Sequence, residues 1–351
     1  MTLDSIRKDV TRAMLVTLFR VIGFALGAII VIFVFGFLFG SGGKPAPQTT
    51  LEVLPNHEWK INEFSKTAPT ILQIDLRGVI GLSRHLRRQE VRKILVESLD
   101  GDLKPGQVKG ILLYIDSPGG TVDDADGIYQ LIKEYKAKTK VNVIAFVDGL
   151  CASGGMYIAC SADKIIATKV SMVGSIGVIM PTAFNVSSLL TRLGVESTTI
   201  FAGVGKDDLN PFRPWKEDEE APYQNLINNA YDQFITLVSA ARPLLTKPVL
   251  QEIGAQVFPT DQALTKGYID EINDSYFAVL EAYSGTLGIQ STYQVVQLKI
   301  ESLLQELFTD ETGATKGALK GTINHQLRLP GDIEPELVGK ALYLYRPNTT
   351  R

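Results

Sequence analysis

Four clusters of small and polar residues could do chemistry, because each follows a run of apolar, mostly β-branched residues. They are Asp116–Gly120 (DSPGG), Cys151–Tyr157 (CASGGMY), Gly174–Gly177 (GSIG) and Ala202–Asp207 (AGVGKD). Glycines after a strand let backbone N–H groups approach a ligand closely. The N-terminus of a helix also directs partly positive N–H donors at a developing oxyanion. Ser153, at the start of a predicted helix, would have such donors beside it and could serve as the nucleophile of an acyl transfer.

A serine nucleophile needs a base, and a lysine is the available candidate. The hydroxyl is a poor nucleophile until a neighbouring group takes its proton. Lysine ordinarily titrates at about 10.4, so a lysine base must be kept neutral by burial or local charge. Lys206 fits this role because it follows an apolar run and two glycines. From the residues alone, Ser153 could equally be a helix N-cap, Ser175 a turn residue and Lys206 an ordinary loop lysine.

Histidine-based catalysis has little support in this sequence. The three histidines are His57, His85 and His325, and none has a context that suggests an imidazole oriented by a carboxylate. The G-x-S-x-G turn of lipases is absent around Ser153, because Cys151 occupies the position of its first glycine.

Metal and cofactor sites are also unsupported. Cys151 and Cys160 lie in an apolar stretch without neighbouring ligands, where buried structural thiols are expected. No phosphate-binding loop or dinucleotide fingerprint occurs, so we expect neither a cofactor nor a metal. The acidic run Glu217–Glu220 is predicted to begin a helix. The net charge of −3 gives no electrostatic support for nucleic-acid binding.

Alternating strand and helix patterns must position the four clusters. Short apolar runs predict strands at 71–76, 110–115, 141–147, 164–168, 173–179 and 195–201. Apolar spacing of three and four predicts helices at 89–99, from Val122 to Tyr135, and at 216–242. This alternation is typical of an α/β layered domain.

The pattern changes after about residue 280. One more amphipathic helix is predicted from the apolar positions Val296, Ile300, Leu303, Leu304 and Leu307. Beyond Asp310 the chain is rich in Gly, Thr and Pro, which predicts a tail or small appendage. We hypothesise that the aromatic and basic segment Lys340–Arg346 docks near the site or a neighbouring subunit.

A segment near the N-terminus has the features of a membrane anchor. Val21–Gly40 carries no charge and is almost wholly apolar. About twenty helical residues span about 30 Å, the thickness of a bilayer's hydrocarbon core. The segment is longer than the apolar region of a cleaved signal peptide, which favours a retained anchor. Four basic residues precede it, so the positive-inside rule places residues 1–20 in the cytoplasm and the remainder outside.

Several motifs, taken together and in order, resemble the signal peptide peptidase A (SppA) and SohB family of membrane-anchored serine proteases. They are DSPGG at 116–120, ASGGMYIACSADKI at 152–165, VGSIGVIM at 173–180, the glycine-rich approach to Lys206, and ALTKGYIDEI at 263–272. The resemblance covers about residues 67–273.

The resemblance implies an α/β fold of the ClpP/crotonase type, built of stacked ββα units. It implies that Ser153 is the nucleophile, that Lys206 is the general base and that Ser175 hydrogen-bonds and orients the lysine amine. The family's oxyanion donors correspond to Gly119, Gly120 and the backbone N–H of Gly154.

The function that this resemblance implies is a serine endopeptidase with a Ser-Lys dyad. It would degrade remnant signal peptides and other membrane-associated peptides. It would span the bacterial inner membrane once, with the catalytic domain outside the cytoplasm. The motifs around Ser153 and Lys206 each occur once, which marks the one-unit type, so the resemblance implies a homo-oligomer and suggests an octamer.

The length of 351 residues allows about two domains. We expect a cytoplasmic N-terminus at 1–20, an anchor and linker at 21–43, the peptidase domain at 44–279, and a C-terminal helix and tail at 280–351. Two other functions stay open. One is a crotonase-like acyl-CoA enzyme, which export from the cytoplasm disfavours. The other is a catalytically silent, oligomeric peptide-binding scaffold, which the presence of both Ser153 and Lys206 disfavours.

Overall fold

The structure is a computed structural model, and it describes residues 49–290, 292–300 and 342–344, together with Thr17, Gly23, Phe24, Leu26, Gly27 and Val31. The chain divides into two compact units, residues 1–48 with 302–307 and residues 49–301 with 308–351. The predicted anchor, Val21–Gly40, lies mostly outside the described residues. In the part of the chain that is described, no helix combines the length and the apolar character needed to span a membrane.

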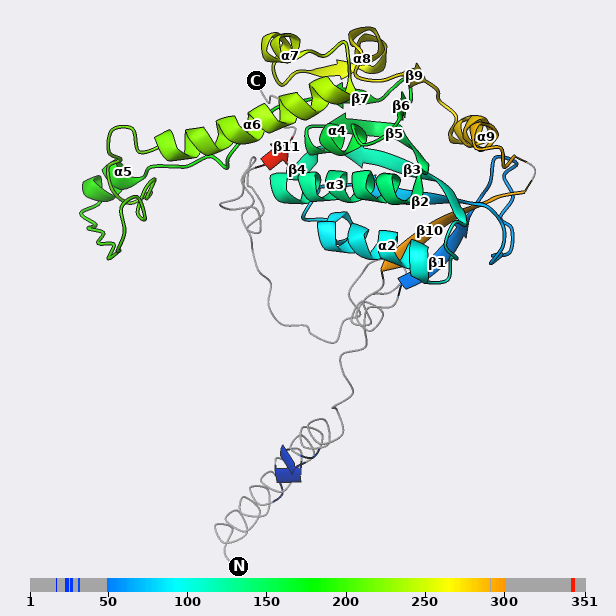
Figure 1. The fold of residues 1–351 in the computed structure, drawn as a ribbon. Helices are drawn as coiled ribbons and strands as arrows, with labels where there is room; N and C mark the ends of the chain where they lie inside the picture. Colours follow the sequence, from blue (N-terminus) through cyan, green and yellow to red (C-terminus); the bar gives the residue numbers. More distant parts are fainter. Residues whose placement is uncertain are drawn as a thin grey trace, which may run out of the picture. The chain divides into compact units, whose positions relative to one another are not determined.

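A nine-stranded, mostly parallel sheet forms the centre of the second unit (Figure 1). Its strands are β1 (Thr49–Leu54), β2 (Thr70–Arg77), β3 (Val108–Ser117), β5 (Asn142–Ala152), β6 (Lys164–Ala167), β7 (Met172–Gly174), β8 (Val257–Pro259), β9 (Glu271–Ile272) and β10 (Gln294–Ile300). The order is β1-β10-β2-β3-β5-β6-β9, while β7 pairs with β5 and β8 pairs with β7. A separate two-stranded ladder joins β4 (Gly119–Thr121) to β11 (Leu342–Leu344).

Helices cover both faces of the sheet, so alternate strand residues enter two different cores. The helices are α2 (Arg88–Asp100), α3 (Val122–Thr139), α4 (Gly154–Ala159), α5 (Ser187–Arg192), α6 (Ala221–Ala241), α7 (Lys247–Ile253), α8 (Thr260–Lys266) and α9 (Tyr276–Thr286), with a short 3-10 turn at Arg84–Leu86. On β3, Ile111 and Leu113 pack in the core that α2, α3, α4 and α6 share, whereas Leu112 packs in the core under α9. Burial on both faces explains why these parallel strands are almost continuously apolar.

Most predicted elements are confirmed. The four strands predicted between residues 71 and 168 correspond to β2, β3, β5 and β6, and the helices predicted at 89–99 and 122–135 correspond to α2 and α3. The helix predicted at 216–242 begins later, at Ala221. The strand predicted at 173–179 is shortened to β7.

The helix predicted from Val296 is wrong where the structure describes it, because residues 294–300 form the strand β10. Val295 enters the core under α9, whereas Val296 and Leu298 enter the other core. A spacing of four residues fits both a helix and a strand, and pairing with β1 and β2 decides for the strand. The sheet therefore continues past the boundary predicted at residue 279. Leu303, Leu304 and Leu307 lie outside the described residues.

Residues 177–220, here called the projecting segment, extend away from the sheet at one end of α6 (Figure 1). The strand predicted at 195–201 is wrong, because this stretch has no regular structure and no neighbouring strand. Side-chain hydrogen bonds hold it instead. Ser197 donates to the carbonyl oxygen of Phe212 at 2.8 Å, and Asn210 donates to the hydroxyl of Thr199 at 2.9 Å.

Candidate active site

Ser153 occupies the tight turn between β5 and α4. Its φ of 54° and ψ of −117° are rare for a residue that carries a side chain. Its amide donates to the Gly174 carbonyl oxygen at 2.9 Å, and its carbonyl accepts from the Tyr157 amide at 2.9 Å. The hydroxyl makes no capping bond to α4, and its hydrogen-bond acceptor is the Gly177 carbonyl oxygen at 3.4 Å. Ser153 is therefore the N-cap residue of α4 by position, but its side chain does not cap the helix, and Gly154 follows it as the first residue of α4.

Gly119 and Gly120 form β4, which contacts α4. A Cβ atom at Gly120 would lie 1.9 Å from the carbonyl oxygen of Ile80, so only glycine fits there. The bridge to Ile80 uses the Gly119 carbonyl and the Thr121 amide. The Gly119 amide donates to the Ser117 hydroxyl at 3.2 Å. Because backbone groups alternate along a strand, the Gly120 amide faces the other edge of β4.

Ser175 lies beside Ser153 because their strands are neighbours. The parallel pairing of β5 and β7 sets Ala152 opposite Gly174, and the two serines follow those residues. Ser175 has a φ of 55°, is 5% exposed, and donates its amide to the carbonyl oxygen of Gln256 at 2.7 Å. The structure thus brings together the two serines that the sequence singles out.

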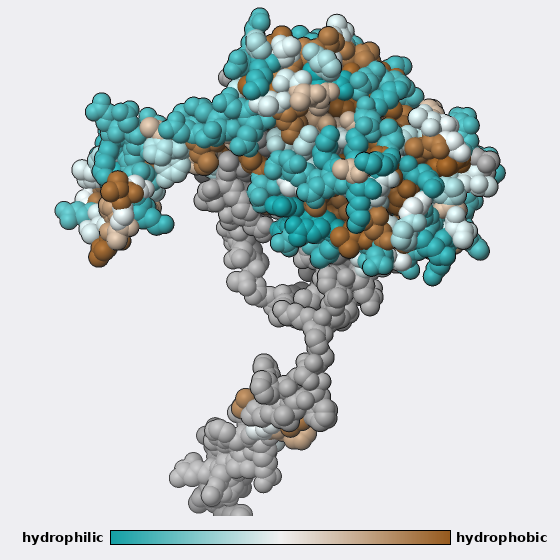
Figure 2. Space-filling view, in the orientation of Figure 1, coloured by the Kyte–Doolittle hydropathy of each residue, from teal (hydrophilic) through white to brown (hydrophobic). Residues whose placement is uncertain are grey.

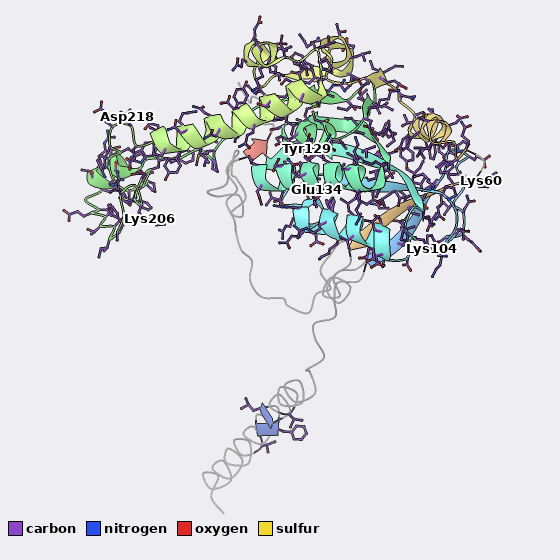
Figure 3. All side chains as sticks on the ribbon, in the orientation of Figure 1. Lys60, Lys104, Tyr129, Glu134, Lys206 and Asp218 are labelled. Atoms are coloured by element: carbon purple, nitrogen blue, oxygen red, sulfur yellow. The ribbon has the colours of Figure 1, made fainter. Side chains whose placement is uncertain are left out.

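Lys206 is not beside Ser153 in this single chain. It lies exposed in a turn of the projecting segment, where its amide is 3.3 Å from the Gly203 carbonyl oxygen. Figure 3 labels it on that segment, at the end of α6 that is remote from the sheet and α4. Among the described residues, none makes a hydrogen bond or ion pair with its ammonium group. Lys206 was predicted to follow a strand at 195–201, and the structure has no strand there.

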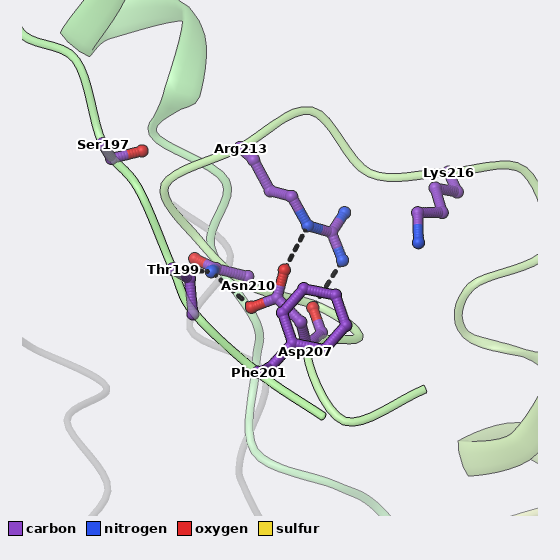
Figure 4. A pocket seen from close by; sticks show the side chains of 7 residues that line it. All are labelled: Ser197, Thr199, Phe201, Asp207, Asn210, Arg213 and Lys216. Carbon is purple, nitrogen blue, oxygen red and sulfur yellow. Dashed lines mark hydrogen bonds and ion pairs between the residues drawn. The ribbon is translucent and has the colours of Figure 1, made fainter. Parts of the chain in front are cut away.

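Arg213 organises the loop that follows Lys206, and we call its contacts with Asp207 and Glu219 the Arg213 clamp. Figure 4 shows its contact with Asp207. The guanidinium Nε donates to Asp207 Oδ2 at 2.6 Å, and Nη1 donates to Glu219 Oε2 at 3.1 Å. Nη2 donates both to Glu219 Oε1 and to the Asp207 carbonyl oxygen. The carboxylate side chains of Asp207 and Glu219 are only 7% and 1% exposed.

Backbone amides complete the clamp around Glu219. Its carboxylate accepts from the Lys216 amide at 2.7 Å and from the Leu209 amide at 3.1 Å. Hydrogen bonds from Arg213 lower the pKa of Glu219 to about 2, and they also lower the pKa of Asp207. The sequence did not reveal this role, because the acidic run predicts that Glu219 lies in the first turn of a helix. The three residues lie six apart in a stretch without helix or strand, so no helical spacing marks them.

Asp116 stabilises the backbone that leads to the nucleophile, a role that the sequence did not reveal. Its Oδ1 atom accepts from the Leu150 amide at 2.9 Å, where the pairing of β3 with β5 is irregular. Gly149 has a φ of 125°, and a Cβ atom there would lie 2.5 Å from the same oxygen. The carboxylate therefore packs against the bulged part of β5, a few residues before Ser153.

Part of the C-terminal tail lies on the glycine strand. In the antiparallel pairing of β11 with β4, Tyr343 is opposite Gly120 and Leu344 is opposite Gly119. The hypothesis that this segment docks near the site is confirmed for residues 342–344. The edge of β4 that carries the Gly120 amide therefore accepts an extended chain.

The other candidate groups are occupied elsewhere. His57 bonds Tyr293 at 2.9 Å, His85 bonds the Arg77 carbonyl oxygen at 3.0 Å, and His325 lies outside the described residues. Cys151 and Cys160 are free and buried, as expected. Burial raises the pKa of both thiols, that of Cys160 to about 12, so neither is a reactive thiolate.

Comparison with known proteins assigns the family. The model for peptidase family S49 matches residues 135–286, and the model for Clp protease matches residues 85–173. A putative signal peptide peptidase SppA from Enterococcus faecium is 29% identical over 265 residues, which cover 72% of this chain and 76% of that protein. A putative protease from Synechocystis sp. is 33% identical over 208 residues, which cover 59% of this chain and 71% of that protein.

The chain therefore belongs to peptidase family S49, the family of SppA and SohB that its motifs resemble, and it is a serine protease. The acyl-CoA and scaffold alternatives lose their support. Among solved structures, the chain is similar to a mutant of ClpP1 from Listeria monocytogenes, with a TM-score of 0.38 and 18% identity, over 59% of this chain and 92% of that one.

Proposed function

We propose that the protein is a membrane-anchored endopeptidase with a Ser-Lys dyad, and that it degrades remnant signal peptides and other membrane-associated peptides outside the cytoplasm. The observation that carries the proposal is the setting of Ser153. Its hydroxyl is buried at a strand-to-helix turn, makes no capping bond, and lies beside the N-terminus of α4. Such a turn presents an oxygen nucleophile next to backbone donors for an oxyanion.

The reaction uses one proton acceptor twice. Neutral Lys206 takes the proton of the Ser153 hydroxyl while Oγ attacks the peptide carbonyl carbon. The backbone amides of Gly120 and Gly154 stabilise the oxyanion, Gly119 shapes their turn, and Ser175 orients the lysine amine. The lysine then protonates the leaving amine, and water hydrolyses the acyl-enzyme by the same route.

Because one chain leaves Lys206 remote from its own Ser153, we propose that a second copy supplies the lysine. The projecting segment carries unusually many exposed apolar side chains for a surface in water. They include Phe184 (73% exposed), Leu193 (67%), Ile200 (96%), Val204 (107%) and Phe212 (52%). Figure 2 shows hydrophobic residues gathered at the end of this segment. A head-to-tail contact of this kind closes into a ring, of which an octamer is one form.

The peptide substrate pairs with β4 in this proposal. The edge that faces away from Ile80 already accepts one extended segment, residues 342–344. Recognition through a strand edge takes main-chain hydrogen bonds from any extended peptide and leaves side-chain preference to nearby pockets. The anchor at residues 21–40 holds the protease at the membrane where such peptides remain.

The test is hydrolysis of a fluorogenic peptide by the full chain in detergent, beside Ser153→Ala and Lys206→Ala. Each variant alone should lose activity while its oligomer size stays the same. Co-assembly of equal amounts of the two inactive variants should restore about a quarter of the wild-type rate. A site is then active only where a copy that keeps Ser153 lies next to a copy that keeps Lys206, and each kind makes up half of the mixture. Recovery of activity is possible only if the two groups come from different copies.

The outcomes separate the parts of the proposal. Activity in Ser153→Ala would exclude the nucleophile, and activity in Lys206→Arg would exclude the base, because a guanidinium does not deprotonate. Two inactive variants that do not complement each other would place both groups in one chain. A rate that is flat between about pH 6 and 9 would also contradict a lysine base.

A further inference from the structure

The projecting segment has no apolar core to hold it in shape. Between residues 177 and 220, the only described residues that are buried as a whole are Ser187 and Glu219, and the Asp207 side chain is also only 7% exposed. Ser187 opens the short helix α5, where its hydroxyl donates to Asn185. Glu219 belongs to the Arg213 clamp. The conformation of the loop that follows Lys206 therefore depends on polar contacts and not on packing.

The clamp is centred on the residue next to Lys206. Asp207 binds Arg213 twice, through its carboxylate and through its own carbonyl oxygen. The carboxylate also accepts from Asn210 at 2.6 Å. These contacts fix both the side chain and the backbone of Asp207, and thereby the direction in which the chain presents Lys206.

A guanidinium is suited to this task in a way that an ammonium is not. The planar fork of Arg213 reaches two carboxylates and also two carbonyl oxygens, those of Asp207 and Pro214. Lysine offers a point charge without fixed donor directions, so it cannot reproduce this arrangement. If the two carboxylates needed only a positive charge nearby, arginine and lysine would serve equally well at position 213.

We propose that Arg213 is a positioning residue, which fixes the loop of Lys206 through Asp207 and Glu219 so that the lysine reaches the nucleophile of a neighbouring copy. This inference rests on the proposed role of Lys206. It assigns to Arg213 no contact with the substrate. It predicts that substitution of Arg213 lowers turnover without weakening peptide binding. The reason is that β4 and Ser153 lie with the sheet and not in the projecting segment.

The experiment compares Arg213→Ala with Arg192→Ala in the full chain. Arg192 is an exposed arginine of α5 in the same segment, and it takes no part in the clamp. For Arg213→Ala we expect kcat to fall about 10- to 100-fold, with KM and oligomer size unchanged. Arg192→Ala should match the wild type in all three quantities.

Chemical rescue separates positioning from a general loss of structure. The clamp borders an open pocket of about 220 Å³ lined by Ser197, Thr199, Phe201, Asp207, Asn210, Arg213 and Lys216. Free guanidinium at non-denaturing concentration can enter it. It should restore part of kcat in Arg213→Ala and leave Arg192→Ala unchanged. Arg213→Lys keeps the charge and should also have reduced kcat, which provides a second variant if the alanine variant does not assemble.

Three results would overturn the inference. One is a kcat for Arg213→Ala within about twofold of the wild type. The others are a loss that appears in KM instead, or a loss that guanidinium does not relieve. Lys206→Ala in the same assay separates this failure from that of the proposed function. If it is inactive while Arg213→Ala is fully active, only the role of Arg213 is wrong, whereas an active Lys206→Ala removes the base itself.

Discussion

Ser153 occupies a backbone conformation that its own side chain disfavours. Its φ of 54° belongs to the left-handed half of conformational space, where only glycine is free of steric cost. Ser175 has a similar φ of 55°, so both adjacent turns of the site hold a serine in that half of conformational space. Strain of this kind persists only where the surrounding structure holds it, and pairing of β5 with β7 does so here.

The strain predicts an order of stability for two inactive variants. Ser153→Gly should raise the free energy of unfolding by about 1 kcal/mol relative to Ser153→Ala, because relief of strain exceeds the extra entropy of unfolded glycine. Urea denaturation checks this difference. At Ser161, whose φ is not positive, the control pair should show the opposite order. A glycine variant at 153 less stable than the alanine variant would contradict the strain argument.

At the scale of elements, the projecting segment differs most from its prediction. The sequence pattern predicts a strand at 195–201 and a long helix that begins at residue 216. The structure has no strand there, α6 begins at Ala221, and the Arg213 clamp lies between these two stretches of the chain. The acidic run Glu217–Glu220 therefore does not form the first turn of the helix, contrary to the prediction. Glu219 turns into the clamp with 1% of its side chain exposed, while α6 begins two residues later at Ala221.

The clamp predicts how the segment responds to acid. The pKa of Glu219 is lowered from 4.5 to about 2, and the pKa of Asp207 is lowered as well. A lowered carboxylate pKa stabilises the fold above the ordinary value, and the stabilisation is lost as the pH falls through the folded value. The Leu209 and Lys216 amides should therefore exchange more slowly in the wild type than in Glu219→Gln at neutral pH. That difference should decline only between about pH 4.5 and pH 2.

Hydrogen exchange read by mass spectrometry on segment-resolved peptides measures this protection. Asp232→Asn on α6 serves as the control, since Asp232 is outside the clamp. Equal exchange in the wild type and Glu219→Gln at pH 7 would show that the carboxylate does not hold the loop.

At the level of the whole molecule, residues 342–344 pair with the glycine strand β4 although the two segments are far apart in the sequence. β11 pairs with the edge of β4 to which we assign substrate binding. A peptide and the tail cannot hold the same edge at the same time. On that assignment, β11 and the substrate compete for the same backbone hydrogen bonds.

Weakening the β11 pairing should raise activity. Tyr343→Pro removes a backbone donor from the ladder, and we expect kcat/KM for short peptides to rise about two- to tenfold. Deletion of the residues after 310 should have at least the same effect. Peptide turnover and oligomer size measure the outcome, with Tyr343→Phe as the control that keeps the donor. Unchanged turnover and assembly in both altered chains would remove the tail from any role at the site.

The sequence alone predicts the layered α/β class, four central strands, the two helices that follow β2 and β4, and the motifs that define the family. It could do so because these features are local. Burial on both faces of a parallel strand requires an apolar run, and a helix on a sheet requires apolar residues every three or four positions. The glycines of β4 were equally visible, since close backbone contact with Ile80 admits no side chain.

The folded chain was needed to establish where Lys206 lies relative to Ser153, what Arg213 and Asp116 do, and that residues 294–300 form a strand. Asp116 and β10 depend on partners distant in the sequence: Asp116 accepts from the Leu150 amide, and β10 is fixed by β1 and β2 more than two hundred residues earlier in the chain. The clamp joins residues that are only six apart, but they lie in a stretch without helix or strand, so no periodic pattern marks them. Local periodicity encodes burial, whereas hydrogen bonds between distant segments leave no periodic trace.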